Sequence, residues 1–325
     1  MTVTVAAGGS AVTPARRVYL PTFGVAAATA GLVWYAVATL ERQGSLGRVL
    51  ALGRAELVAP AVVVVVAVAL VCERLWPADG RREVTAGLAH DAGYLLVHLT
   101  VAVPIMTLLS VAFGSLLAFH ARWMELGGTA SWPRPALFAL TVVLMDAGNW
   151  LAHWADHRLE PLWRFHALHH SQEELNVLTA FRAHPLSHLA GFFLATLPVV
   201  VLVGDREVAP ALITGYVCVG TLSHANVPWT FGPIGKVIVS PAYHRIHHSP
   251  QGALGLNLGV VLTVWDVLAG RARFPNPAAP ACATGLAGRP VPVEESGLEL
   301  RTLLAQLGEP FRARRGGQGR AAAPS

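Results

Sequence analysis

Histidines gather in three short motifs in the centre of this 325-residue chain, where eleven of its 14 histidines lie between positions 153 and 248. On a helix, residues at positions i, i+3 and i+4 share one face, so each motif directs two or three imidazoles toward one point. Imidazole is a ligand of zinc, copper, iron and nickel. The motifs HWADH, HALHH and HRIHH supply His153, His157, His166, His169, His170, His244, His247 and His248. Eight nitrogen donors exceed what one ion takes, which indicates a site for two metals.

Structural packing is the alternative explanation for each of these histidines. Burying unpaired imidazoles side by side in an apolar environment is costly, which disfavours packing as the role of three whole clusters. A single histidine in an apolar helix is a different case, because one neighbour can satisfy it. We therefore interpret His90, His98 and His120 as structural residues.

The composition identifies the kind of protein that must position these motifs. Hydrophobic residues make up 54% of the chain and charged residues only 13%, about half of what a soluble domain carries. This excludes disordered, collagen-like and disulfide-scaffold classes and predicts an integral membrane protein. The 24 basic and 19 acidic residues give a net charge of +5, but the arginines stand mostly at the ends of apolar runs. We therefore expect no nucleic-acid partner. The three cysteines form no CxxC pair and support neither a disulfide framework nor a cysteine metal site.

Long apolar runs predict the membrane-spanning elements. Residues 18–40 contain no charged side chain and are long enough to cross the hydrocarbon layer, and further spans are expected at 57–72, 92–121 and 135–152. Two shorter runs, 189–203 and 208–223, predict a hairpin, and residues 298–307 an amphipathic helix. The predicted organisation is a tail at 1–17, transmembrane helices at 18–134, a catalytic domain at 135–274 and a C-terminal tail at 275–325. The fold class is all-α: a multi-span membrane helical bundle with a cytoplasmic, histidine-rich helical cap that holds a di-metal site.

The distribution of arginines predicts the orientation of this bundle. The basic residues that flank the first three spans divide evenly between the two sides of the membrane. Arg158, Arg164, Arg182 and the basic C-terminal tail then add to the side that carries the N-terminus and the histidine motifs. Because cytoplasmic segments carry the excess of basic residues, both termini and the histidine motifs are expected in the cytoplasm of a bacterial inner membrane.

The sequence around the histidines resembles a known family over about residues 135–315. The segment DAGNWLAHWADHRLEPLWRFHALHHSQEELNVLTAFRAHP begins at Asp146, and SHAN, PAYHRIHHS, NLG, VWDVLAG and LLAQLGEPFR follow in order. These motifs are similar to those of the fatty acid hydroxylase/sterol desaturase superfamily of membrane di-iron oxygenases. The resemblance implies two iron ions as cofactors, with dioxygen as a co-substrate.

The resemblance also implies roles for individual residues. It makes the eight motif histidines metal ligands, adds His224 as a ninth, and gives His184 a role as a ligand or close to one, while His188 departs from the common pattern. A carboxylate near the centre of a span needs a partner, so Asp146 is expected to accept a hydrogen bond from a ligand imidazole and fix its tautomer. Asp156 and Asp266 compete for that role.

The chemistry implied by the resemblance is oxidation of a C–H bond in a lipid, with hydroxylation favoured over desaturation. The chain has no glycine-rich dinucleotide motif and no cysteine cluster, so electrons must come from an external donor: a reductase, cytochrome or ferredoxin. Two other functions remain open from the residues alone. These are a zinc-dependent membrane enzyme and a haem-binding electron-transfer protein.

Overall fold

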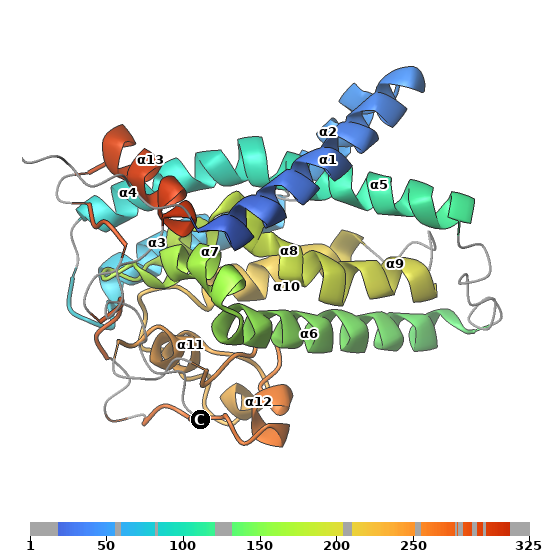
Figure 1. Ribbon diagram of the computed structural model, residues 1–325. Helices are drawn as coiled ribbons and strands as arrows, with labels where there is room; N and C mark the ends of the chain where they lie inside the picture. Colours follow the sequence, from blue (N-terminus) through green and yellow to red (C-terminus); the bar gives the residue numbers. More distant parts are fainter. Residues whose placement is uncertain are drawn as a thin grey trace, which may run out of the picture.

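The fold of the chain, given by a computed structural model, consists of helices and connecting loops (Figure 1). The structure describes residues 19–55, 60–81, 84–120, 132–203, 210–250, 255–276, 278, 282–287, 291–294 and 297–312. The predicted N-terminal tail at 1–17 and the end of the C-terminal tail lie outside these residues. The described residues contain no β-strand, and an isolated bridge joins Ile238 to Leu262, which agrees with the expected all-α class.

Three apolar helices among the described residues are long enough to cross a membrane. They are α1 (Leu20–Arg42), the continuous helix at Ala86–Phe113 and α6 (Arg134–Arg158). The second consists of α4 (Ala86–Val97), the π-helical turn η1 (His98–Ala102) and the first part of α5 (Val103–His120). The predicted span at 57–72 corresponds to α3 (Pro60–Leu75), which has 16 residues. The apolar runs thus predicted helices at these positions, but three of the four predicted spans reach spanning length, and α3 does not.

The predicted hairpin packs inside this framework. Its first arm is α8 (Leu189–Gly191), the π-helical turn η6 (Phe192–Thr196) and α9 (Leu197–Val203), and its second arm is α10 (Pro210–Leu222). A side chain at Gly148 of α6 would overlap the backbone oxygen of Leu194. Glycine at this position is therefore what lets α6 approach η6 closely.

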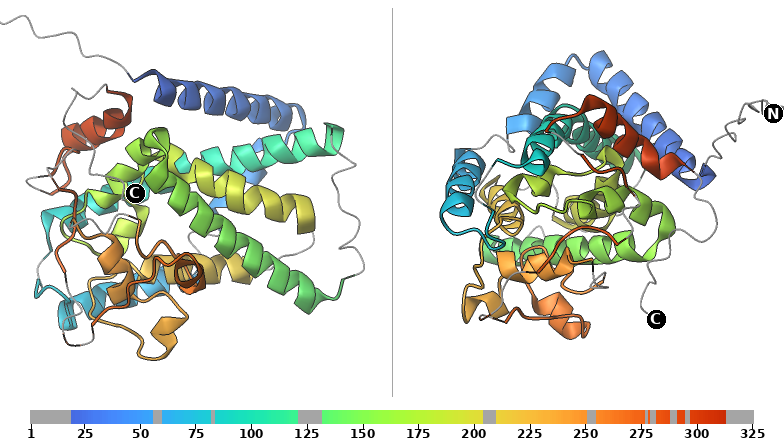
Figure 2. Two further views of the ribbon diagram at one scale, coloured as in Figure 1. Left: turned by 60° about the horizontal axis from the view of Figure 1, so that its bottom comes forward. Right: turned by 90° about the vertical axis from the view of Figure 1, so that its left-hand side faces the viewer.

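The remaining short helices gather at one end of the bundle. In Figure 1, α1, α5, α6 and α9 extend to the right, whereas α7 (Glu160–His170), α11 (Pro241–His247) and α13 (Leu300–Gly308) lie toward the left, with α12 (Val264–Leu268) beside α6. The short helix α2 (Leu46–Ala55) follows α1 at the opposite end. Figure 2 shows α13 crossing the end of the bundle beside the start of α1. There the amide of Tyr19 donates to the carbonyl of Phe311 in η8 (Glu309–Phe311), at 2.9 Å.

A buried polar network fastens the C-terminal segment to this end of the bundle. Arg182 is fully buried and pairs with Asp91 and Glu294, each at 3.0 Å. Burial alone would raise the pKa of Glu294, but the guanidinium of Arg182 holds it below its usual value. His90 contacts the side-chain oxygen of Gln306 at 3.0 Å, which gives His90 the structural role predicted for it.

Candidate metal centre

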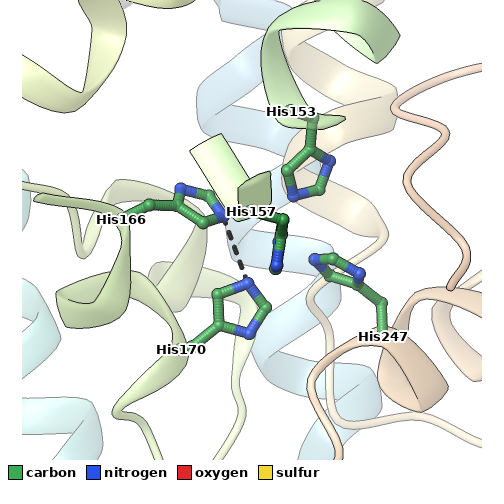
Figure 3. Close-up of side chains that lie close together, drawn as sticks. All are labelled: His153, His157, His166, His170 and His247. Carbon is green, nitrogen blue, oxygen red and sulfur yellow. Dashed lines mark hydrogen bonds between the residues drawn. The ribbon is translucent and has the colours of Figure 1, made fainter. Parts of the chain in front are cut away.

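Five imidazoles from three helices form one group at the end of α6 (Figure 3). Helix α6 ends at Arg158, and α7 starts immediately with Glu160 and Pro161, so the two helices form a tight corner. This corner turns the histidines of α6 toward those of α7, and α11 closes the group. Their ligand atoms all lie within 4.8 Å of one another, and the members are His153, His157, His166, His170 and His247.

Four more imidazoles form a second group beside the first. Helices α7 and α11 contribute to both groups, and the turn after α10 supplies His224. The Nε2 atom of His224 lies 3.1 Å from that of His169 and 3.0 Å from that of His244. The Nε2 atoms of His244 and His248 are 3.2 Å apart. Each HxxHH motif therefore divides its histidines between two sites instead of serving one.

The spacing of these nitrogens fits a bound ion. Two nitrogen ligands about 2.1 Å from one ion lie about 3.0 Å apart at a right angle and about 3.4 Å apart at the tetrahedral angle. The three distances in the four-histidine group fall near the first value. In the five-histidine group, the buried Nε2 atoms of His153 and His247 and both ring nitrogens of His157 have no hydrogen-bond partner among the described residues. Such atoms are costly to bury, and an ion would satisfy them.

The protonation of the imidazoles suits metal binding as well. Burial lowers the pKa of His166, His169, His170, His244, His247 and His248 well below the usual value, and neighbouring imidazoles lower it further. Burial also lowers the pKa of His224 to about 4. All seven are therefore neutral at physiological pH, and the neutral form is the one that binds a metal. Two groups of neutral imidazoles match the two-metal site expected from the sequence.

Backbone carbonyls fix the orientation of several of these rings. With Nδ1 as the donor, His153 binds the carbonyl of Leu258 and His247 that of Leu256, both at 2.8 Å. His224 binds the carbonyl of Gly220 at 2.7 Å in the same way. A carbonyl that accepts from Nδ1 leaves the Nε2 lone pair free for a metal. Carbonyl groups belong to every residue type, so no side-chain motif could have identified these partners.

Asp266 and Asn257 hold the loop that carries two of these carbonyls. Asp266 is fully buried and accepts from the amides of Leu258 at 2.9 Å and Gly259 at 2.8 Å. Asn257 has a φ of 54° and donates from its side chain to the carbonyls of Tyr243 and Arg273. Asp266 therefore helps to orient His153 by holding this loop, and Asn257 of the NLG motif holds the conformation of the same loop.

Asp146 occupies a different position from the one expected. Its carboxylate accepts from the indole of Trp265 at 2.8 Å and the hydroxyl of Tyr216 at 3.2 Å, and the described contacts include no imidazole. The expected bond to a ligand histidine is therefore corrected: Asp146 joins α6 to α12 and α10. Asp156 was expected to compete with Asp146 for the bond to a ligand imidazole, and its Oδ2 lies 3.9 Å from Nδ1 of His166.

His184 also lies away from both histidine groups. Its Nδ1 accepts from the amide of Leu186 at 3.1 Å at the start of η5 (Pro185–His188), and its ring packs on Phe165 and Phe311. Pro185 begins this turn, and His184 precedes it as the N-cap residue. The role as a ligand expected for His184 is therefore corrected for the described structure. His188 lies outside both groups as well.

A cavity of about 520 Å³ opens from the histidines into the bundle. One end is lined by His153, His166, His169, His224 and His244, and the walls include Val103 and Met106 of α5, Phe192 of η6 and Val217 of α10. Both π-helical turns contribute to the walls. A mostly apolar cavity with imidazoles in its lining suits a ligand that is itself largely apolar.

Comparison with known proteins finds similarity over the region that contains this site. The family model for fatty acid hydroxylase matches residues 138–271, which contain all nine grouped histidines. The ornithine lipid hydroxylase OlsE of Rhizobium tropici is 32% identical over 198 residues, which are 60% of this chain and 55% of that protein. Alkylglycerol monooxygenase is 26% identical over 140 residues in Caenorhabditis elegans and 25% over 140 residues in Homo sapiens.

These matches leave part of each relative uncovered. The chain covers about half the length of the bacterial relative and 26% and 31% of the two animal proteins. No solved structure matches the chain. The family model, the curated relatives and the histidine motifs nevertheless agree. All three indicate similarity to the fatty acid hydroxylase family over residues 138–271.

Proposed function

We propose that this protein is a membrane-bound, dioxygen-dependent oxidoreductase that uses two iron ions to hydroxylate a C–H bond of a lipid. The observation that carries the proposal is the pair of imidazole groups that line part of a mostly apolar cavity. The names of the relatives, an ornithine lipid hydroxylase and alkylglycerol monooxygenases, support a lipid substrate and hydroxylation as the reaction.

Different residues of the chain have different roles in this reaction. The two histidine groups would hold the irons, which supply reductive activation of dioxygen for attack on an unactivated C–H bond. The apolar walls at Val103, Met106 and Phe192 hold an alkyl chain and exclude water from the site. The loop around Asn257 keeps His153 and His247 in the orientation in which their Nε2 atoms face the group. Electrons are supplied by a separate reductase, cytochrome or ferredoxin.

The reaction is tested with purified protein reconstituted anaerobically with Fe(II). A chemical reductant, labelled dioxygen and either ornithine lipid or an alkylglycerol are added, and product mass is followed. We expect one labelled oxygen in the product. Loss of two hydrogens without label would establish desaturation instead, and conversion that proceeds equally well without dioxygen would refute the proposal. Metal analysis of the active protein separates two irons from zinc alone or one haem.

The proposed orientation places the histidine groups on the cytoplasmic side of a bacterial inner membrane. Leu159, at the corner between α6 and α7, is 51% exposed, and Trp132, before the other end of α6, is 46% exposed. In a background without the three native cysteines, an impermeant thiol reagent should label the Trp132→Cys variant in intact cells. The Leu159→Cys variant should be labelled only after lysis. The reverse pattern would invert the proposed topology.

A further inference from the structure

A second pair of histidines faces the cavity outside both metal groups. His98 begins the π-helical turn η1, and His188 ends η5. Their rings meet edge to face with centroids 5.1 Å apart, and both line the cavity that contains the metal-binding histidines. His98 was interpreted from the sequence as a packed residue, but its position on a cavity wall next to His188 calls for another role.

Each ring has a buried nitrogen that no described residue satisfies. These atoms are Nδ1 of His98 and Nε2 of His188. The nearest aromatic neighbour of His98 outside the pair is Phe181, with ring centroids 5.5 Å apart, which supports the ring but offers no polar group. A buried polar atom without a partner is unfavourable unless water or a ligand provides one. The cavity is the space from which that partner can come.

The backbone of η1 supports a functional position for His98. A π-helical turn is rare and is frequently found at functional sites. The turn η1 places His98 and Ala102 on the cavity wall, and η6 places Phe192 and Thr196 there. Two irregular turns in otherwise regular helices therefore border the same cavity.

The lining of the cavity limits the chemistry of the group that this pair can bind. Asp156 lines it, with an Oδ1 that is buried without a hydrogen-bond partner among the described residues, and the described lining contains no arginine or lysine. Burying the charge of a carboxylate without a cationic partner is costly. An imidazole ring accepts at one nitrogen and donates at the other. The combination fits a hydroxyl or an amide N–H and disfavours a carboxylate.

We propose that His98 and His188 form the subsite that binds the polar end of the lipid, and that this end is a hydrogen-bond donor, either a hydroxyl or an amide N–H. The proposal rests on the proposed function and adds to it the chemical class of the substrate. Because one cavity joins the pair to both metal groups, a polar group held here places the neighbouring carbons of the chain near the metal-binding histidines.

Binding of four lipids of equal chain length tests this subsite without turnover. The iron-reconstituted protein is kept without reductant, and its affinity is measured for hexadecanol, hexadecanamide, hexadecanoate and hexadecane. We expect the alcohol or the amide to bind most tightly, and the ranking of these two identifies the donor. Replacing His98 or His188 by leucine should weaken that lipid about tenfold, the value for one lost hydrogen bond, and leave hexadecane within about twofold.

Two further variants make the result specific. His98→Gln keeps a hydrogen-bonding side chain and should recover part of the affinity that the leucine variant loses. Leu96→Ala, on the exposed side of α4, should bind all four lipids as the unchanged protein does. Iron content is measured for every variant and should stay the same.

Three outcomes would overturn the proposal. They are tightest binding of hexadecanoate, an equal loss for all four lipids in the leucine variants, and loss of iron from those variants. The binding assay is independent of catalysis. A selective loss of affinity in a protein that oxidises no lipid would keep the subsite and refute the proposed function.

Discussion

Replacing Asp266 with asparagine is expected to weaken iron binding at the five-histidine group, although Asp266 contacts no histidine directly. The carboxylate holds the loop whose carbonyls at Leu256 and Leu258 accept from the Nδ1 atoms of His247 and His153. If the loop shifts, two of the five imidazoles lose the partner that orients them. No histidine is replaced, so the variant tests the positioning of the ligands without removing a ligand.

The size of the effect follows from the hydrogen bonds of the carboxylate. Oδ1 accepts from Trp150 and from the amide of Leu258, and Oδ2 accepts from Tyr243 and from the amide of Gly259, at 2.8–2.9 Å. Asparagine retains one oxygen, so two of the four bonds are lost and an NH₂ group faces donors. Hydrogen bonds to charged groups contribute about 1.5–3 kcal/mol each, so the site loses roughly 3–6 kcal/mol, of which the one lost bond to the loop accounts for about 1.5–3 kcal/mol. Loss of a partner that orients a ligand weakens metal binding about 10–100-fold.

The assay is an Fe(II) titration of the metal-free protein against a competing chelator, which resolves two binding steps. One step should weaken in Asp266→Asn and the other should stay unchanged, because the carbonyl of Gly220, outside this loop, orients His224 in the four-histidine group. Asp146→Asn is the matched control. Asp146 is also a buried carboxylate, bonded to Trp265 and Tyr216, but neither partner orients a histidine. This control should lose stability and retain both iron affinities.

Two results would refute this reasoning. Wild-type affinity at both steps in Asp266→Asn would mean that the loop does not position the ligands. Equal weakening in Asp266→Asn and Asp146→Asn would mean that general destabilisation, not ring orientation, controls iron binding.

Four further variants have distinct expected outcomes. His244→Ala should lose one iron and all lipid oxidation, whereas His184→Ala should keep both irons, and metal analysis of the two decides whether His184 is a ligand. Gly148→Ala should lower the midpoint of thermal inactivation, because the added methyl group overlaps the backbone oxygen of Leu194. Overpacking of this kind costs about 1–3 kcal/mol. An unchanged midpoint would contradict this contact. Arg182→Met leaves two buried carboxylates unpaired, so a loss of about 3–5 kcal/mol should appear in denaturant unfolding, and a loss below about 1 kcal/mol would argue against the network.

The sequence by itself determined the class of protein and the kind of site. Low charge and long apolar runs indicate membrane helices because the hydrocarbon layer of a membrane accommodates few charged side chains. Such runs can be recognised from a short stretch of the sequence alone. The HxxHH spacing places imidazoles on one helical face, which again needs no knowledge of the rest of the chain. Together they predicted an all-α bundle with a two-metal histidine site, and the same motifs resemble those of the fatty acid hydroxylase/sterol desaturase superfamily.

Only the tertiary structure decided how the histidines are shared between the two groups. His166 and His170 face α6, whereas His169, next to them in sequence, faces His224 after α10. That division depends on which helices lie on either side of α7, and helical spacing carries no information about neighbours. The carbonyls that orient the rings carry no sequence signal for the same reason.

The role of Asp146 and the pairing of His98 with His188 show the same limit. A buried carboxylate must have a partner, but sequence does not tell whether that partner is an imidazole or, as here, the indole of Trp265. His98 and His188 are 90 positions apart and meet only because two irregular turns face one cavity. Local spacing determines which side chains share a face, whereas the packing of distant segments determines what that face meets.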